Sequence, residues 1–187
     1  MKKLNVLIVL LLLAGSTIAQ TTWSVDKAHS KLGFTVTHLM VSEVDGTFNS
    51  FDAKITSTKD DFSDATVELT ADVNSVDTNN ERRDNHLKSP DFFDAAQFGT
   101  LTFKSTAIKK TGEKTYKVTG DLTMHGVTKS VELDATLIGT TASRDGKKIS
   151  GWKVTGTINR IDFKVGTSGP TVSDEVVLTA KAEFKSN

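Results

Sequence analysis

Residues 31–39, with the sequence KLGFTVTHL, decide the fold. Apolar and polar side chains alternate along this stretch, and one face carries Leu32, Phe34, Val36 and His38. A period of two residues is typical of a β-strand that buries one face against a core. The stretch therefore predicts a half-buried strand, with His38 on the same inward face as its apolar neighbours.

The same alternation recurs along the chain and predicts eight strands. Their approximate spans are 31–39, 46–56, 65–73, 100–108, 115–124, 127–139, 149–163 and 174–185. The phase slips near Asn49-Ser50, as expected at a β-bulge. Because short turns join most of these runs, neighbouring strands should be antiparallel. Such a set can split into a sandwich or close as a barrel, and we expect the barrel because closure leaves no unpaired edges. The predicted fold class is all-β.

Residues 78–99 interrupt the strand pattern between the third and fourth strands. Thr78-Asn79-Asn80-Glu81 has the form of a capping box, and Ser89-Pro90 offers an N-cap followed by proline at the first helical position. We therefore expect two short helices here. Leu87, Phe92, Phe93 and Phe98 give them an apolar side. Such a segment serves equally well as a plug in one barrel end or as a lid over a ligand mouth, and both interpretations stay open.

Length and charge restrict the class of protein further. The chain has 187 residues, 23 basic and 23 acidic side chains, and no cysteine. This length suits a single folded domain, and the balanced charge gives no basic field that would attract nucleic acid. Without cysteine, disulfides, thiolate metal sites and thiol nucleophiles are excluded.

The first 19 residues have the pattern of a secretory signal. Two lysines precede an apolar stretch over residues 4–14, and Thr17-Ile18-Ala19 supplies small residues before a cleavage point. A membrane anchor is the alternative, but the stretch falls short of the ~20 apolar residues that span a bilayer. We expect a signal peptide over 1–19, a folded domain over 20–187, and a periplasmic or secreted protein.

Catalytic motifs are missing from the sequence. The four histidines, His29, His38, His86 and His125, show no H-E-x-x-H or H-x-H spacing, and neither G-x-S-x-G nor a phosphate-binding glycine loop occurs. We therefore expect no enzyme activity, no bound metal and no cofactor. Of the histidines, only His38 is expected to point inward, either as a hydrogen-bonded core residue or as a ligand contact. A metal-assisted lipid hydrolase that uses His38 and His29 is the weaker alternative.

Small side chains occupy many of the inward positions. They are Ala71, Ser105, Ala107, Gly120, Ala135, Gly139, Gly156, Ala180 and Ala182. An eight-stranded barrel can either fill its interior with side chains or hold one small ligand. Small residues at these positions favour a cavity, whereas the alternative is that they merely face large residues across the barrel.

Several motifs together resemble one known family. They are Trp23-Ser24-Val25-Asp26-Lys27-Ala28-His29-Ser30, Gly46-Thr47-Phe48, Asn74-Ser75-Val76-Asp77-Thr78, Ser89-Pro90-Asp91-Phe92-Phe93-Asp94, Gly120-Asp121-Leu122-Thr123-Met124-His125-Gly126 and Asn159-Arg160-Ile161-Asp162-Phe163. In this order they resemble the YceI-like family of secreted lipid-binding proteins, over essentially the whole of residues 20–187. Gly99 and Lys164 depart from the family pattern, which has proline and glycine there.

The resemblance implies a lipocalin-like barrel whose long apolar cavity holds a polyisoprenoid or a prenylated quinone. Fatty acids or fatty amides are the alternative ligands. It carries over no catalytic residues, and it allows Arg160 to pair with Asp162 at a barrel end. The inward parity of Arg160 would otherwise require a carboxylate or a phosphate partner.

We therefore expect a non-enzymatic carrier of a long-chain lipid, with no nucleic-acid partner. Transient membrane contact and a homodimer stay open. The expected ligand-binding residues are Phe34, Val36, His38, Phe48, Val67, Leu69, Ala71, Phe92, Phe93, Phe103, Leu122, Met124, Trp152, Ile158, Arg160, Val176, Leu178 and Ala180.

Overall fold

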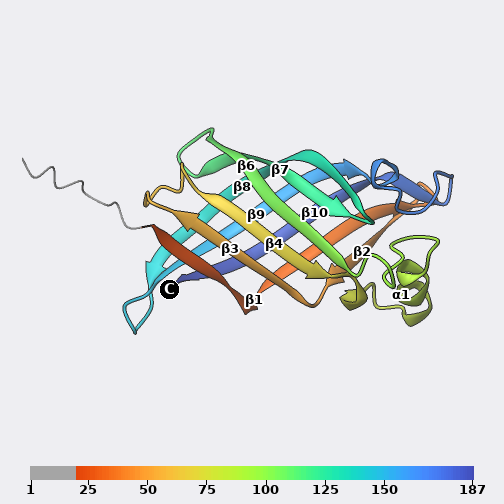
Figure 1. Ribbon diagram of the computed structural model, residues 1–187, viewed down its shortest axis with the longest axis horizontal. Helices are drawn as coiled ribbons and strands as arrows, with labels where there is room; N and C mark the ends of the chain where they lie inside the picture. The colour runs from red at the N-terminus through yellow and green to blue at the C-terminus, as the bar shows by residue number, and fades with distance from the viewer. Residues whose placement is uncertain (1–19) are drawn as a thin grey trace, which may run out of the picture.

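Ten β-strands curl around one long axis in the computed structural model, which describes residues 20–187 (Figure 1). The predicted signal peptide over 1–19 lies outside the described residues. The strands are β1 (Thr21–His38), β2 (Ser42–Phe48), β3 (Phe51–Ser57), β4 (Thr66–Asp72), β5 (Val76–Asp77), β6 (Thr100–Lys110), β7 (Thr115–Met124), β8 (Val127–Ala142), β9 (Lys148–Asn159) and β10 (Val172–Ser186). The helical elements are α1 (Glu81–Lys88) and two 3₁₀ turns, η1 (Val73–Ser75) and η2 (Arg160–Phe163).

Antiparallel pairing of β1 with β10 closes the sheet into a barrel. The strand order is β10-β9-β8-β7-β6-β4-β3-β1, and β1 then returns to β10. The first part of β1 pairs with β3 and its second part pairs with β2, so β2 and β3 form one wall segment that is broken at Asn49-Ser50. The barrel therefore has eight wall segments, as the sequence predicts, and the phase slip at Asn49-Ser50 marks that break.

The first strand begins at Thr21, ten residues before its predicted start. A register shift against β10 lies between Asp26 and Lys31. Because the extra residues of a bulge invert the faces of the strand, alternation does not continue through residues 26–31. The alternation of residues 31–39 therefore does not extend back to Thr21, and the sequence pattern does not predict the first half of β1.

Between β4 and β6 the chain forms one α-helix and a set of turns. Asn80 is the N-cap of α1, because its side-chain oxygen accepts the Arg83 backbone N–H at 3.0 Å. The Thr78 hydroxyl, predicted as the cap, instead donates to Asp84 at 2.6 Å. The second predicted helix does not form after Ser89-Pro90, because the Phe93 and Asp94 N–H groups bond back to the carbonyls of Leu87 and Ser89. These wide turns carry Phe92 and Phe93 toward the barrel.

Bulges overturn two of the predicted inward positions. Ala107 follows a register shift between β6 and β7 and is exposed. Gly139 follows a register shift between β8 and β9, after which Thr140 lies opposite the buried Ser150. Because neighbouring residues of a strand point to opposite faces, Gly139 lies on the outward face. One extra residue at each place inverts the alternation beyond it.

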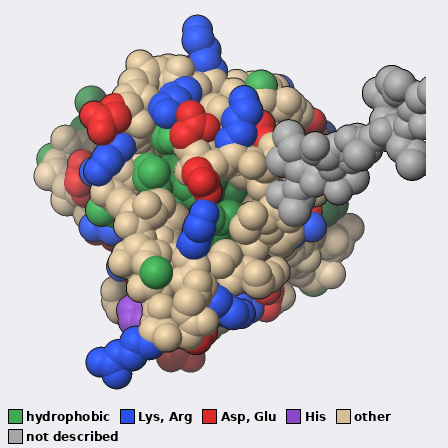
Figure 2. Space-filling view, turned by 90° about the vertical axis from the view of Figure 1, so that its left-hand side faces the viewer, with side chains coloured by type: hydrophobic (Ala, Val, Ile, Leu, Met, Phe, Trp, Pro, Cys, Tyr) green, Lys and Arg blue, Asp and Glu red, His purple; other side chains and the backbone are tan. Residues whose placement is uncertain are grey.

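The loop over residues 58–65 plugs the barrel end that lies opposite α1. Phe62 is only 2% exposed and packs between Trp23 and Trp152, with ring centroids 5.2 and 5.1 Å away. The Tyr116 hydroxyl donates to the Asp61 carbonyl at 2.8 Å, and Lys110 pairs with the Asp61 carboxylate at 2.9 Å. Figure 2 looks onto this end and shows apolar side chains surrounded by charged ones. The plug is therefore an apolar side chain held in place by polar contacts around it.

Within residues 20–187, no helix is both long and apolar enough to cross a membrane.

We predict that Phe62→Ala lowers the free energy of unfolding by about 3–5 kcal/mol, the usual cost of removing a buried phenylalanine ring. Lys59→Ala, at an exposed position of the same loop, serves as the control. Urea unfolding measures both variants. A Phe62→Ala protein as stable as the Lys59→Ala protein would show that the plug contributes nothing to the fold.

The Asp64 carboxylate accepts hydrogen bonds from the Ser57 hydroxyl at 2.6 Å and from the Thr58 backbone N–H at 3.1 Å. These bonds hold the pKa of Asp64 well below its usual range. The folded state therefore favours the carboxylate, and its stabilisation is complete above about pH 5 and fades as pH falls below about 4.

Asp64→Asn should accordingly be less stable than wild type at pH 7, and the gap should narrow at pH 2.5. Unfolding curves at the two pH values check this. A gap that is equally wide at both would contradict the assigned role of the carboxylate.

Candidate functional site

Two adjoining cavities occupy the barrel interior. The one next to the plug, called here the inner cavity, has a volume of about 170 Å³. The one at the α1 end, called here the outer cavity, has a volume of about 830 Å³. Phe48, Leu101 and Leu178 line both of them and form the neck between them. The site is therefore an elongated hollow that runs from the mouth at α1 toward the Phe62 plug.

The wall of the inner cavity is almost wholly apolar. Six of the predicted ligand-binding residues line it in addition to the neck, namely Val67, Leu69, Phe103, Leu122, Trp152 and Ala180. Ala135 and Ala182, two further small residues predicted to face inward, also lie in this wall. With so few polar groups, the inner cavity suits a hydrocarbon chain and offers nothing to a charged or strongly hydrogen-bonding group.

The outer cavity combines an apolar wall with a polar rim. The predicted residues in it are Phe34, Val36, His38, Phe92, Phe93, Met124, Ile158, Arg160 and Val176. Leu87, Phe92 and Phe93 also line this cavity, so the 78–99 segment borders the mouth and does not plug the barrel. The plug is at the other end and is formed by the 58–65 loop. Alternation along the strands therefore predicted most of both walls.

Ala71 is the exception among the predicted ligand-binding residues, because it lines neither cavity. It is fully buried and lies opposite Phe51 on β3 and Leu101 on β6. Its small side chain makes room for protein neighbours, and its position outside both cavity walls does not support the expectation that it binds ligand.

The small inward residues serve two purposes. A Cβ atom on Gly120 would lie 2.4 Å from the Phe103 ring, and one on Gly156 would lie 2.4 Å from a Leu133 methyl group. These two glycines therefore accommodate large neighbours. Ala180, in contrast, lines open space. Both predicted explanations, close packing against large residues and a cavity, hold at different positions.

The rim of the outer cavity includes polar residues that sequence reasoning missed. Arg83 lines the mouth and donates to the Thr78 hydroxyl at 2.7 Å and to the Thr78 carbonyl at 2.8 Å. His86 lies beside it and pairs with Asp91 at 3.2 Å. Lys164 borders the mouth from the loop that precedes β10. If the predicted helix had been placed over the mouth, Arg83 and His86 could have been predicted as rim residues. No sequence pattern near Lys164 predicts that it lies at the rim.

His38 lies at the rim, half-buried, on the same inward face as Val36. Its ring makes no hydrogen bond within residues 20–187, and it lines the outer cavity. The expected core partner for this histidine is therefore not among those residues, and its nitrogen atoms are available to a polar group in the cavity.

Arg160 holds the loop that borders the mouth. Its side chain is 6% exposed, and burial lowers the pKa of its guanidinium. The predicted pairing with Asp162 is wrong, because the ion pair is with Asp174 at 3.3 Å. The guanidinium also donates to four backbone carbonyls, those of Val165 (2.8 Å), Thr167 (3.0 Å), Val172 (3.1 Å) and Ser173 (2.9 Å). Because each of its three nitrogen atoms already donates to the protein, Arg160 shapes the rim and has few donors left for an anionic head group.

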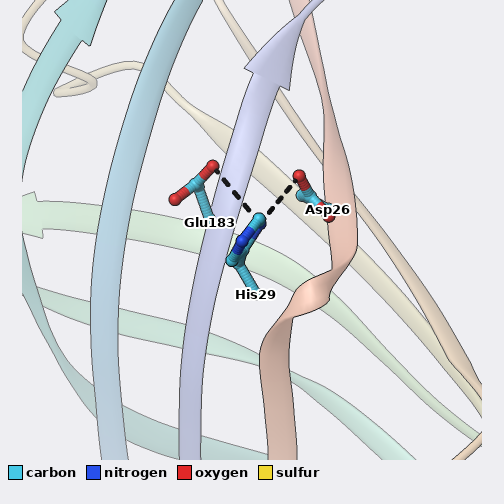
Figure 3. A group of neighbouring side chains, drawn as sticks. All are labelled: Asp26, His29 and Glu183. Atoms are coloured by element: carbon cyan, nitrogen blue, oxygen red, sulfur yellow. Dashed lines mark hydrogen bonds and ion pairs between the residues drawn. The ribbon is translucent and has the colours of Figure 1, made fainter.

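A third group of side chains lies outside the barrel (Figure 3). His29 Nδ1 is 3.1 Å from Asp26 Oδ2 and 3.9 Å from Glu183 Oε1. These are donor types that a divalent metal can use. However, the Lys185 ammonium group lies 2.5 Å from the same Asp26 oxygen, and this contact with Lys185, followed by that with His29, holds the pKa of Asp26 far below its usual range. The ammonium group of Lys185 therefore competes with any metal for this Asp26 oxygen.

The structure does not bring His29 and His38 together, as the hydrolase alternative requires. They lie nine positions apart on β1, or roughly 30 Å at the usual rise of a β-strand. His29 is exposed, whereas His38 lines the outer cavity.

Comparison with known proteins agrees with this architecture. A family model for the YceI-like domain matches residues 23–184. The UPF0312 protein SA2479 of Staphylococcus aureus (strain N315) is 38% identical over 171 residues, which cover 88% of this chain and 97% of that protein.

Solved structures share the barrel. BcnA of Burkholderia cenocepacia superposes with a TM-score of 0.77 at 28% identity, over 85% of this chain and 98% of BcnA. A polyisoprenoid-binding domain from Saccharophagus degradans, implicated in plant cell wall breakdown, gives a TM-score of 0.63 over 88% of this chain and 98% of that domain. At 16% identity, the second likeness concerns the fold alone. The family model and the staphylococcal relative both extend over nearly the whole barrel, and the chain therefore belongs to the YceI-like family.

Proposed function

We propose that this protein binds one long-chain apolar lipid, a polyisoprenoid or a prenylated quinone, and carries it without chemical change. The observation that supports this most strongly is the elongated apolar hollow, which is plugged at one end and bordered by polar groups at the other. The Saccharophagus degradans domain of the same fold, described as polyisoprenoid-binding, supports the choice of ligand class.

In this proposal the lipid enters with its tail first. The tail passes the neck at Phe48, Leu101 and Leu178, and its end lies against the Phe62 plug. The head group stays at the rim, near His38 and Arg83. Burying ~500 Å² of tail at about 25 cal/mol/Å² gives roughly 12 kcal/mol before the costs of association, so the tail supplies most of the affinity.

The proposed location is the periplasm, or the outside of the cell. This rests on the signal-like pattern of residues 1–19 and on a chain without cysteine. There, a closed barrel would shield an apolar chain from water while it moves between membranes or protein partners.

Mass spectrometry of an organic extract from the purified full chain tests the ligand class. We expect one dominant isoprenoid or prenylated quinone in near-equal amount to the protein. A fatty acid or fatty amide in that amount would replace the proposed ligand, and a protein that takes up none of these lipids would contradict lipid binding.

Filling the inner cavity should block the tail. We predict that Ala180→Phe reduces lipid occupancy at least roughly tenfold, because the new ring takes up space that the tail needs. Lys181→Phe, at the exposed neighbouring position on β10, is the matched control and should retain the lipid. Ala71→Phe should overpack the core at roughly 1–3 kcal/mol and lower the melting temperature. Full occupancy in folded Ala180→Phe would show that the tail does not use the inner cavity.

The alternative of a metal-assisted hydrolase through His38 and His29 would need another set of metal ligands, and the cluster of Asp26, His29 and Glu183 is the candidate within residues 20–187. We predict that dialysed wild-type protein holds far less than one zinc ion per chain, because Lys185 occupies the Asp26 oxygen. Lys185→Ala removes that competitor and should increase zinc affinity without changing lipid occupancy. Elemental analysis and isothermal titration measure both proteins, and one tightly held zinc ion in the wild type would revive the hydrolase.

A further inference from the structure

The hairpin between β1 and β2 ends in three consecutive apolar side chains that face solvent. Leu39 is 53% exposed, Met40 is 88% exposed and Val41 is 82% exposed. Elsewhere in residues 20–187, large apolar side chains are exposed only singly, at Ile138 and Val177. Single exposed apolar residues are ordinary, whereas a contiguous group at a convex tip calls for a reason. Residues 39–41 are called the apolar tip below.

The apolar tip is attached to the mouth of the outer cavity. The Leu39 backbone N–H donates to the Thr171 carbonyl at 2.9 Å, and both Thr171 and His38, the residue before the tip, line that cavity. The Val41 N–H donates to the His38 carbonyl at 3.1 Å. Figure 1 shows the hairpin at the same end of the barrel as α1. The tip thus stands beside the opening with two of its N–H groups already satisfied, which lowers the cost of moving it into an apolar phase.

The backbone of the hairpin does not require these residues. Leu39 and Met40 have φ angles of 50° and 60°, in the left-handed region where Asn and Gly are the usual residues of a tight turn. The β7–β8 turn of the same chain, with φ angles of 49° and 71°, places Gly126 at its second position. The conformation of this turn therefore favours Asn or Gly, yet the tip carries large apolar side chains.

We propose that the apolar tip inserts into the surface layer of a lipid bilayer and brings the mouth of the outer cavity against the membrane. This inference rests on the proposed function, since the ligand of the adjacent cavity is then itself a lipid. A stable protein dimer needs about 800 Å² and roughly 20–30 residues on each partner, far more than three side chains offer. A bilayer interface, in contrast, accepts a small convex group of apolar side chains.

Tryptophan fluorescence with brominated lipids tests the insertion directly. Met40→Trp places a reporter at the tip, and Ile138→Trp places one on an exposed apolar position of β8 as the matched control. Trp23 and Trp152 are buried in the barrel, and the wild-type signal provides their background. The vesicles contain phosphatidylethanolamine and phosphatidylglycerol, with and without brominated acyl chains. We expect brominated chains to quench about half of the added Met40→Trp emission and almost none of the Ile138→Trp emission, as insertion 5–10 Å deep requires. Equal quenching, or none, at both positions overturns the proposal.

A transfer assay tests the consequence for lipid loading. The double variant Met40→Ser/Val41→Ser should take up a fluorescently tagged polyprenol from vesicles at least roughly tenfold more slowly than wild type, because docking no longer holds the mouth at the membrane. Capture of the same probe from dilute ethanol should be unchanged, and Ile138→Ser should match wild type in both assays. Unchanged transfer from vesicles, or a dimer of the wild type that the double variant dissolves, overturns membrane docking. If no probe is captured from ethanol, the proposed lipid carriage fails, while the quenching experiment still decides whether the tip inserts.

Discussion

Pairing of β1 with β10 closes the barrel, and both cavities lie inside the closed barrel. It extends from Trp23 opposite Ser186 to His38 opposite Val172, and without it the sheet would have two open edges and no interior. Between its two halves β1 also changes its other partner from β3 to β2, and the register shift at residues 26–31 lies between these two pairings. The Asp26 carboxylate accepts the Ala28 N–H, and the Ser30 hydroxyl accepts the Glu183 N–H, both at 3.0 Å. The Asp26-Lys27-Ala28-His29-Ser30 motif therefore stabilises the seam of the barrel.

Closure at the seam gives the barrel two different ends. At one end Phe62 fills the opening, and the Tyr116 hydroxyl and Lys110 bind the same loop. At the other end Arg160 uses its donors on the rim loop, which keeps that loop in place beside open space. A hollow with one plugged end and one open end imposes a direction on any chain-like ligand. The polar side chains Arg83, His86 and Lys164 line the open end of this hollow.

Much of this architecture could be predicted from the sequence, because local alternation records burial directly. Residues 31–39 and the runs like them specify eight wall segments, and their parity places residues such as Leu69 and Ile158 correctly in the cavity walls. Ala107 and Gly139 were placed wrongly, because a single extra residue inverts the faces of a strand and is visible only in the register of its partner.

Other features depend on contacts between distant parts of the chain. The sequence predicts that Arg160 pairs with Asp162, but Arg160 binds Asp174 and backbone carbonyls instead. Because every residue has a backbone carbonyl, the sequence does not indicate which of them an arginine binds. The Phe62 plug lies in a short polar loop whose apolar residue gives no periodic signal. Wide turns form after Ser89 in place of the predicted helix, because the Phe93 and Asp94 N–H groups bond to the carbonyls of Leu87 and Ser89. Helix-capping patterns in the sequence do not predict these bonds. Sequence patterns therefore predicted the walls of the site but not its two ends.

If the inner and outer cavities form one site for a single lipid tail, a crystal structure of the protein loaded with a polyprenol should show the tail in both. We expect continuous density that passes between Phe48, Leu101 and Leu178 and ends beside Phe62. Density confined to the outer cavity, with the neck closed and the inner cavity empty, would show that the two cavities do not form one site.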